Sequence, residues 1–377
     1  MQSKAYIQNI PENKGISINW KNYTSSAGLV LLVIISALLS PTFLLPANIM
    51  NIATQIAAPG ILAVGMTYVI LTAGIDLSVG SLLALTGVFI AITAPTIGWP
   101  LAVLLAIGIG ILIGCFHGYL ITKVKLAPFI VTLASLTAFR GISLVSTNSA
   151  AIPISSDSFS YLGSGKINTT ISLSLVIIIA VFVLVNTIMT SKSMENTEKI
   201  KKVMTALFSI FGLTIFGYLI YKVKGIPIQV LFFIGIFIIG WFILNKTVFG
   251  REVYAMGGNF EAARLAGVRV NRGIMLVYAI AGFLSAVAGT LVAARLGSGT
   301  PQVGVLSELD AIAAVVIGGS SLMGGVGRLG GTLIGVILIG VLNNLLSLLN
   351  ITSDMQMVFK GAIILGAVIL DGKFSKK

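Results

Sequence analysis

Long runs of uncharged apolar residues recur along the chain and limit what it can fold into. One run, residues 171–190 (ISLSLVIIIAVFVLVNTIMT), contains no Asp, Glu, Lys or Arg. The hydrocarbon core of a bilayer is about 30 Å thick, and a helix of roughly 20 mostly apolar residues crosses it. Only 9% of the 377 residues are charged, against about 25% in soluble domains. The runs therefore predict a polytopic membrane protein and exclude a soluble globule.

The pattern predicts an all-α fold, a bundle of about twelve membrane segments. A barrel strand would alternate apolar and polar residues, whereas residues 176–185 are apolar at every position. The 42 glycines provide small faces on which helices can approach each other closely in lipid. The expected segments are 27–45, 52–72, 80–94, 101–121, 126–146, 171–190, 203–222, 227–245, 273–294, 309–321, 329–349 and 355–370.

Two of these segments are short for an upright crossing. Residues 80–94 and 309–321 are therefore expected to be broken or partly re-entrant pieces, buried within the bundle where protein replaces lipid around irregular backbone. All of residues 1–377 are assigned to a single membrane domain.

The distribution of basic residues predicts the orientation. With both termini in the cytoplasm, 18 of the 24 Lys and Arg residues fall on the cytoplasmic side. The net charge of +13 then reflects positive-inside loops and not a nucleic-acid partner. The first apolar run, residues 27–39, has no small-residue cleavage site after it, so we expect an uncleaved anchor.

The chain lacks the residues that hydrolytic or redox chemistry needs. Cys115 and His117 are its single Cys and His, too few for an internal disulfide or a zinc site. The glycine-rich stretch GGSSLMGGVGRLGG has no following Lys-Ser/Thr pair and is not a Walker A loop. We expect no ATP hydrolysis, no enzyme activity and no cofactor on this chain.

A few ionisable residues lie in or near the apolar segments. Asp76 falls in an expected turn at the cytoplasmic edge, and Glu308 and Asp310 begin a short helix that Ser307 is expected to cap with Asp310. Arg140 is read as a snorkelling or helix-pairing cation, with a pore role as the alternative. His117 is read as a polar link between helices, with proton relay as the alternative.

One cytoplasmic segment, residues 250–272 (GREVYAMGGNFEAARLAGVRVNR), contains a short helical pattern. Asn259 is suited to begin this helix and Gly267 to end it. Its small residues and its charges would fit a partner's groove, and a plain interfacial loop is the alternative. A second soluble stretch, residues 192–202, is read as a solvated charged linker.

Three stretches resemble the ribose-type sugar ABC permeases. They are AVGMTYVILTAGIDLSVGSLLALTG (63–87), GREVYAMGGNFEAARLAGVRVNR (250–272) and ELDAIAAVVIGGSSLMGGVGRLGGTLIGVILIGVLNNLLSLL (308–349), and the similarity extends to residues 126–145 and 359–371. The chain departs from the compact ribose-type pattern between about 186 and 240, where a linker and a helical hairpin look inserted into a ten-segment family core. Xylose-type members are also longer.

The resemblance implies the membrane subunit of a type II-like importer in the bacterial cytoplasmic (inner) membrane. It implies a homodimer, ATP-binding subunits that hold ATP and Mg, and a sugar-binding protein, with membrane lipid around the chain. It also places the ATPase-coupling helix at Asn259, Glu261, Ala262, Ala263, Arg264, Ala266 and Gly267. The cargo would be ribose or a related pentose such as xylose.

Two Gly- and Ser-rich segments, Leu71 to Gly80 and Ile317 to Arg328, are the expected translocation path or hinge, because they permit non-helical backbone beside a cavity. Their candidate residues are Gly74, Asp76, Ser78, Gly80, Gly318, Gly319, Ser320 and Ser321. The alternatives to an ATP-driven importer are a secondary sugar transporter with Asp76 or Asp310 as the ion-coupling group, and a structural or channel protein.

Overall fold

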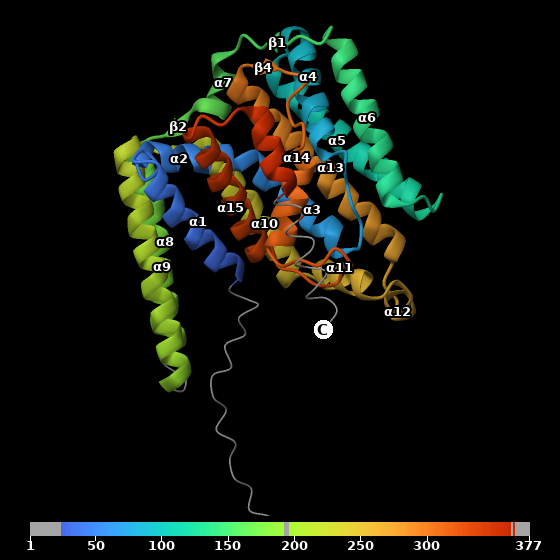
Figure 1. Cartoon of the computed structure of the whole chain (residues 1–377). Helices are drawn as coiled ribbons and strands as arrows, with labels where there is room; N and C mark the ends of the chain where they lie inside the picture. Colours follow the sequence, from blue (N-terminus) through green and yellow to red (C-terminus); the bar gives the residue numbers. More distant parts are fainter. Residues whose placement is uncertain (1–23, 192–195, 363–364, 366–377) are drawn as a thin grey trace, which may run out of the picture.

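The computed structural model describes residues 24–191, 196–362 and 365. Its described part is almost entirely helical (Figure 1). The helices are α1 (Thr24–Leu39), α2 (Pro46–Gln55), α3 (Ala57–Leu71), α4 (Val79–Ile97), α5 (Trp99–Thr122), α6 (Pro128–Ser146), α7 (Asp157–Ser164), α8 (Thr169–Ser191), α9 (Asn196–Val223), α10 (Ile228–Lys246), α11 (Val248–Gly258), α12 (Phe260–Leu265), α13 (Val270–Leu296), α14 (Ser307–Ile317) and α15 (Leu329–Leu348). Residues 353–362 are also helical.

Two small antiparallel sheets of two strands each connect loops that are far apart in sequence. Strand β1 (Ile152–Pro153) pairs with β4 (Ser298–Gly299), and β2 (Lys166–Ile167) pairs with β3 (Ile226–Pro227). In Figure 1, β1, β4 and α7 lie at one end of the bundle, while α11 and α12 lie at the opposite end.

Eight helices among the described residues are long and apolar enough to cross a membrane, or up to nine if the bent pair α2 and α3 is one span. The eight are α4, α5, α6, α8, α9, α10, α13 and α15. Helix α1 is a shorter apolar helix. The expected segment 355–370 lies partly outside the described residues, so the count of twelve stays a prediction.

Three expected boundaries are revised by the structure. Segment 80–94 was wrongly judged too short, because α4 continues through Pro95 to Ile97 and has 19 residues. Segment 52–72 is not one straight helix, since α2 and α3 are bent by 41°. Pro59 cannot donate to the carbonyl of Gln55, which weakens the helix at this bend. Segment 309–321 is indeed short: α14 ends at Ile317 after 11 residues.

Helices α3 and α13 form the centre of the bundle. Every residue of α3 except Pro59 is buried. Helix α13 packs against α3, α4 and α5 and is buried along most of its second half. A helix that is apolar all round and buried all round is typical of the interior of a bundle. The lipid-facing helices are arranged around this pair.

A stripe of glycines on α5 lets α13 come into backbone contact. Gly110, Gly114 and Gly118 are spaced four residues apart and face α13. A Cβ at Gly110 would lie 2.5 Å from the carbonyl oxygen of Gly282, and one at Gly118 would lie 2.5 Å from the Cα of Met275. Because lipid supplies no hydrophobic drive between helices, such close packing is a main source of their association.

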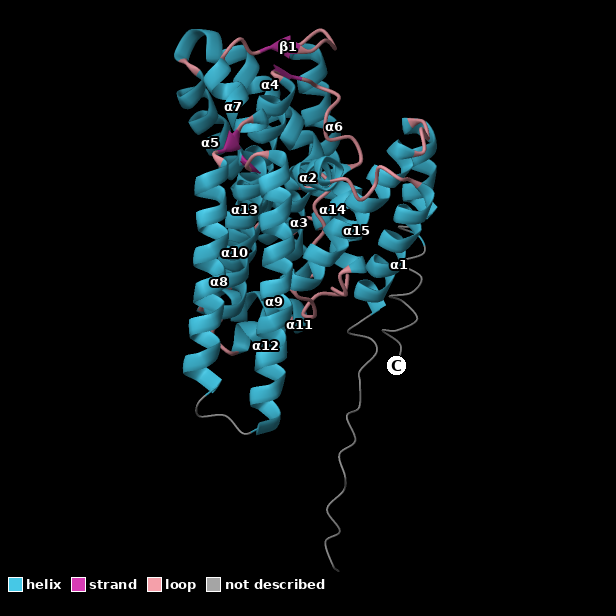
Figure 2. Cartoon of the chain, turned by 90° about the vertical axis from the view of Figure 1, so that its left-hand side faces the viewer, coloured by secondary structure: helices cyan, strands magenta, loops and turns pink. Residues whose placement is uncertain are grey.

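Helices α8 and α9 form a long antiparallel hairpin at the edge of the bundle (Figure 2). Most of their side chains are exposed in this chain, including Phe182 and Phe208. The residues predicted to be inserted, 186–240, cover the end of α8, all of α9 and most of α10. Their status as an insertion stays a prediction.

The α5–α13 contact predicts a large difference between two substitutions on α5. Gly114→Leu should destabilise the protein by about 1–3 kcal/mol or more, because the new side chain would collide with the backbone of Tyr278 and Ala279. Gly108 has no atom within 4 Å of an added Cβ, so Gly108→Leu is the matched control and should leave stability nearly unchanged. Thermal unfolding of the purified protein measures both, and equal losses would contradict this packing.

Candidate functional site

The most exposed helix at the α11 end of the bundle is α12, and its sequence fixes both of its ends. The side chain of Asn259 accepts a hydrogen bond from the Ala262 amide at 2.9 Å, as expected of an N-cap. At the other end, the amide of Gly267 donates to Arg264 and that of Val268 donates to Ala263. Gly267 has φ +86°. This is a Schellman motif, in which glycine adopts the left-handed conformation without strain.

The sides of α12 differ in their surroundings. Ala263 is buried, whereas the Leu265 side chain is 83% exposed. Glu261 and Arg264 are both exposed and form an ion pair at 2.9 Å. Such an exposed pair adds only about 0.2–0.5 kcal/mol to a helix. The predicted start and end of this helix are confirmed by the structure, and its coupling role stays a prediction.

Helix α11 connects α12 to the bundle through a backbone contact at Gly257. A Cβ at this position would collide with the carbonyl oxygen of Leu71 and lie 2.5 Å from the amide nitrogen of Gly325. That amide donates to the Leu71 carbonyl at 2.9 Å. Three segments that are far apart in sequence therefore meet here: α11, the end of α3, and the loop between α14 and α15.

The loop of residues 318–328 is held in a strained path that only glycine takes easily. Gly319, Gly324 and Gly325 have φ of +87°, +84° and +70°. The Tyr254 hydroxyl on α11 donates to the Gly327 carbonyl at 2.9 Å. Burial raises the pKa of the Tyr254 hydroxyl, which keeps it protonated and able to donate. The loop is thus joined to α11 at two points.

Ser320 lies in this loop and is fully buried. Its hydroxyl oxygen has no hydrogen-bond partner among the described residues. A buried hydroxyl without a partner costs about 1–3 kcal/mol. Its neighbour Ser321 is satisfied, since its hydroxyl accepts from the Met323 amide at 3.2 Å. Gly318 packs directly on the backbone of Gly331 at the start of α15.

A second irregular segment, residues 72–78, connects α3 to α4. Asp76 lies in this non-helical turn, as expected, and its side chain is buried. Its carboxylate accepts from the amide of Ser78 at 2.8 Å and from the Ser78 hydroxyl at 2.6 Å. The preceding carbonyl of Ile75 accepts from Thr132 on α6 at 3.3 Å. A Cβ at Gly74 would lie 2.7 Å from the Tyr278 hydroxyl on α13.

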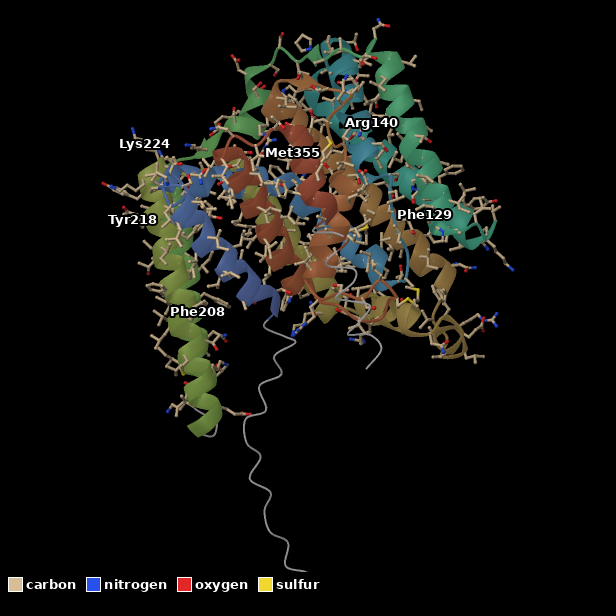
Figure 3. The ribbon with its side chains drawn as sticks, viewed as in Figure 1. Phe129, Arg140, Phe208, Tyr218, Lys224 and Met355 are labelled. Carbon is tan, nitrogen blue, oxygen red and sulfur yellow. The ribbon has the colours of Figure 1, made fainter. Side chains whose placement is uncertain are left out.

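The N-terminal ends of α4 and α14 meet at Gly80. A side chain there would collide with the carbonyl of Gly304 and the carboxylate of Glu308. Glu308 is buried, at 7% exposure. Arg140 lies on α6, where Figure 3 labels it. It donates to the carbonyls of Pro301 and Val303, the latter at 2.7 Å. Its guanidinium thus holds the irregular segment before α14. Because these carbonyls lie outside a helix, both the helix-pairing reading of Arg140 and its pore alternative stay predictions.

Two further polar residues are resolved by the structure. The His117 ring nitrogen and the Ser135 hydroxyl lie 2.8 Å apart, which confirms a polar link between α5 and α6.

The capping prediction for Ser307 and Asp310 is wrong: the N-cap position is Leu306. Asp310 instead forms an ion pair with Lys360 at 2.7 Å, and both side chains are mostly buried. Removing either partner of such a mostly buried pair would leave an uncompensated charge.

The structure brings the predicted coupling segment and both predicted path segments into one connected region. Leu71, Gly257 and Gly325 share backbone contacts, while Gly80 and Glu308 form a second junction at the N-terminal ends of α4 and α14. The sequence reasoning missed Tyr254 and Lys360 as partners. Tyr254 lies within residues 250–272, but nothing in the sequence around it indicated that its hydroxyl would donate to the Gly327 carbonyl.

Comparison with known proteins identifies the family. Residues 48–368 match the model of the branched-chain amino acid transport system / permease component family. The chain belongs to this family. It is 42% identical to the ribose import permease protein of Bacillus subtilis (strain 168) over 349 residues, which are 92% of each chain.

Two further relatives cover nearly all of the chain. The xylose transport system permease protein of Haemophilus influenzae is 37% identical over 372 residues, covering 96% of this chain and 98% of the relative. The ribose import permease protein of Escherichia coli (strain K12) is 39% identical over 353 residues, 93% of each chain. No solved structure matches the chain.

The contact at Gly257 predicts different outcomes for two adjacent glycines. Gly257→Ala should separate α11 from Leu71 and Gly325 at a cost of about 1–3 kcal/mol, and amide exchange at Gly325 should accelerate about tenfold or more. Gly258 has open space around an added Cβ. Gly258→Ala should leave exchange unchanged, and hydrogen exchange of the loop peptides measures both. Faster exchange in both variants would contradict the contact.

The Asp310–Lys360 ion pair predicts a non-additive double mutant. Lys360→Met leaves a mostly buried carboxylate unpaired and should cost on the order of 3 kcal/mol. Adding Asp310→Asn should restore most of that stability, because the neutral side chain needs no counter-charge. Thermal unfolding of both variants and the wild type gives the coupling energy. A double mutant as unstable as the sum of the single changes would show that the pair does not interact.

Proposed function

We propose that the chain is the membrane-spanning subunit of an ATP-driven importer for a monosaccharide, with ribose or xylose as the cargo class. The observation that carries this proposal is the connection from exposed α12, through α11 and Gly257, to the two irregular segments of the bundle. Such a connection can transmit force from a soluble partner to a path. The names of relatives that are 37–42% identical, ribose import and xylose transport permease proteins, support the cargo class.

The proposed orientation places α11 and α12 in the cytoplasm of a bacterial inner membrane, with both termini on the same side. Five basic residues lie from the last residue of α10 to the first turn of α13, as the positive-inside rule requires of a cytoplasmic segment. They are Lys246, Arg251, Arg264, Arg269 and Arg272. Helix α7 and the β1–β4 sheet would then face the sugar-binding protein outside.

The proposed partner at α12 is an ATP-binding subunit that holds ATP and Mg. Leu265 and Phe260 expose apolar side chains on this helix, 83% and 41% exposed, beside a charged pair. A short helix with an exposed apolar side chain at each end and a charged pair between them suits insertion into a groove. Asn259, Ala262 and Ala266 would keep the helix narrow and fixed at its ends. A second copy of the chain would complete the assembly.

The proposed mechanism uses loop 318–328 as an element with two arrangements. In the present arrangement the Ser320 hydroxyl is buried without a partner, which costs free energy. Movement of α11 would pull on Leu71 and Gly325 together, because one backbone hydrogen bond joins them. A rearranged loop in which Ser320 gains a partner would offset part of the cost of moving. Gly318 and Gly319 would supply the hinge.

The proposed path is lined by neutral polar groups and not by ion-coupling carboxylates. Asp76 is satisfied by two hydrogen bonds from Ser78, and Asp310 is paired with Lys360. Neither carboxylate is free to exchange an ion without first losing these partners. A neutral sugar requires no buried counter-charge. These contacts disfavour the ion-coupled alternative.

A substitution at the tip of α12 tests the proposal. In vesicles containing this chain, its ATP-binding subunit and its binding protein, Leu265→Ser should reduce ATP-dependent uptake of labelled ribose or xylose at least tenfold. The reason is the loss of an apolar anchor at the centre of a docking surface, which costs about 2 kcal/mol or more. Uptake and ATP hydrolysis stimulated by the binding protein are both measured.

Val248→Ser is the matched control, because Val248 is an exposed apolar residue at the start of α11, 60% exposed, away from α12. It should leave uptake unchanged. Full uptake in the Leu265→Ser variant would remove α12 from the docking surface. Uptake that persists without a functional ATP-binding subunit would favour the secondary transporter instead.

A further inference from the structure

A pocket of about 570 Å³ lies between α2 and the outer end of the α8–α9 hairpin, remote from α11 and α12. This volume is within the range of about 300–1,000 Å³ that ligand pockets occupy. Residues from α2, β2, α9 and β3 form its walls. They are Leu45, Pro46, Ala47, Met50, Asn51, Thr54, Lys166, Lys222, Val223 and Pro227.

The lining of this pocket is apolar with a basic rim. Lys166 and Lys222 come from different elements and both line it, and no Asp or Glu among the described residues does so. The Lys166 ammonium donates to the Val223 carbonyl at 3.0 Å, and the Lys222 ammonium lies 5.7 Å from the centre of the Tyr218 ring. Two ammonium groups are thereby held near one cavity, and their charge favours an anion.

Two further features fit this anion to a lipid. The pocket includes the first residues of α2, where Leu45 offers no side-chain cap. Pro46 has no N–H, so the amides that follow it in this turn are the ones that can face an anion favourably. Met50 packs in a buried cluster with Val176 of α8 and Leu219 of α9, and many other apolar side chains of these two spanning helices are exposed. The pocket therefore lies where the ends of membrane spans meet water, at the depth of headgroups.

We propose that this pocket binds the phosphate of an anionic phospholipid in the outer leaflet, with the acyl chains along α8 and α9. Lys166 and Lys222 would hold the phosphate, while Asn51 and Thr54 would reach the polar part of the headgroup. In the proposed orientation these lysines lie on the outer side, whereas the positive-inside rule places most basic residues on the cytoplasmic side. Binding an anionic headgroup would explain why they are there. The inference uses the proposed orientation but not the cargo.

Native mass spectrometry of the purified full-length chain tests the site, with phosphatidylglycerol and phosphatidylcholine of identical acyl chains as probes. The wild type should retain phosphatidylglycerol preferentially. Each lysine near an anionic surface contributes about 1 kcal/mol, so Lys222→Ala should weaken retention about fivefold and Lys166→Ala with Lys222→Ala about 25-fold. Lys224→Ala is the matched control, because Lys224 is exposed two residues further along and does not line the pocket.

Three results would overturn the proposal. Equal weakening by Lys222→Ala and Lys224→Ala would show general surface charge, and equal retention of the two lipids would show no headgroup recognition. Displacement of phosphatidylglycerol by inorganic phosphate at equimolar concentration would make free phosphate the ligand. If the Lys166 and Lys222 variants lose lipid binding but keep sugar uptake, the site is supported and the proposed function stands. If a variant loses uptake but keeps lipid binding, the result bears on the proposed function and not on the lipid site.

Discussion

The backbone contact among Leu71, Gly257 and Gly325 is the point on which the rest of the arrangement depends. It exists because two glycines carry no side chain where three segments converge. One hydrogen bond, from the Gly325 amide to the Leu71 carbonyl, closes it. Since packed interiors are nearly incompressible, a displacement of α11 moves the end of α3 and the following loop together. A looser contact between flexible side chains would absorb that displacement.

Irregular backbone within a membrane bundle needs partners for its polar groups, and this chain supplies them from neighbouring helices. Arg140 on α6 serves the segment before α14, and Thr132 on the same helix serves the loop that contains Asp76. The Ser320 hydroxyl is the contrasting case, buried and unpaired. Most polar groups of the irregular segments therefore have hydrogen-bond partners. The unpaired Ser320 hydroxyl raises the free energy of the present arrangement of the loop before α15.

The helices at the periphery of the bundle are stabilised differently from those at its centre. Helices α3 and α13 are fixed by close packing on glycines, whereas the α8–α9 hairpin touches the bundle mainly near its outer end and exposes apolar residues along its length. Van der Waals packing between helices and contact with lipid replace water-driven burial there. The hairpin is thus a lipid-facing element whose outer end, with Lys166 and Lys222, lines a pocket beside α2.

The sequence by itself determined the class of protein, most of the spanning helices and both ends of α12. These features depend on local pattern: apolar length, the Asn259 cap and the Gly267 terminus are set by neighbours in the chain. It also pointed to both irregular segments through their Gly and Ser content. The helix of α12 and the non-helical backbone of residues 72–78 and 318–328 were predicted correctly, whereas Gly80 lies within α4. The functional roles of all these residues stay predictions.

Only the tertiary structure decided which of these pieces touch. Nothing local in Asp310 indicates Lys360, fifty residues away, and the capping pattern at Ser307 pointed to a different partner. The bend at Ile56 and the full length of α4 were also misjudged, because proline near a helix end bends one helix and is tolerated in another according to its packing. Long-range contacts depend on how helices pack in three dimensions, and the spacing of residues along one chain does not encode that arrangement directly.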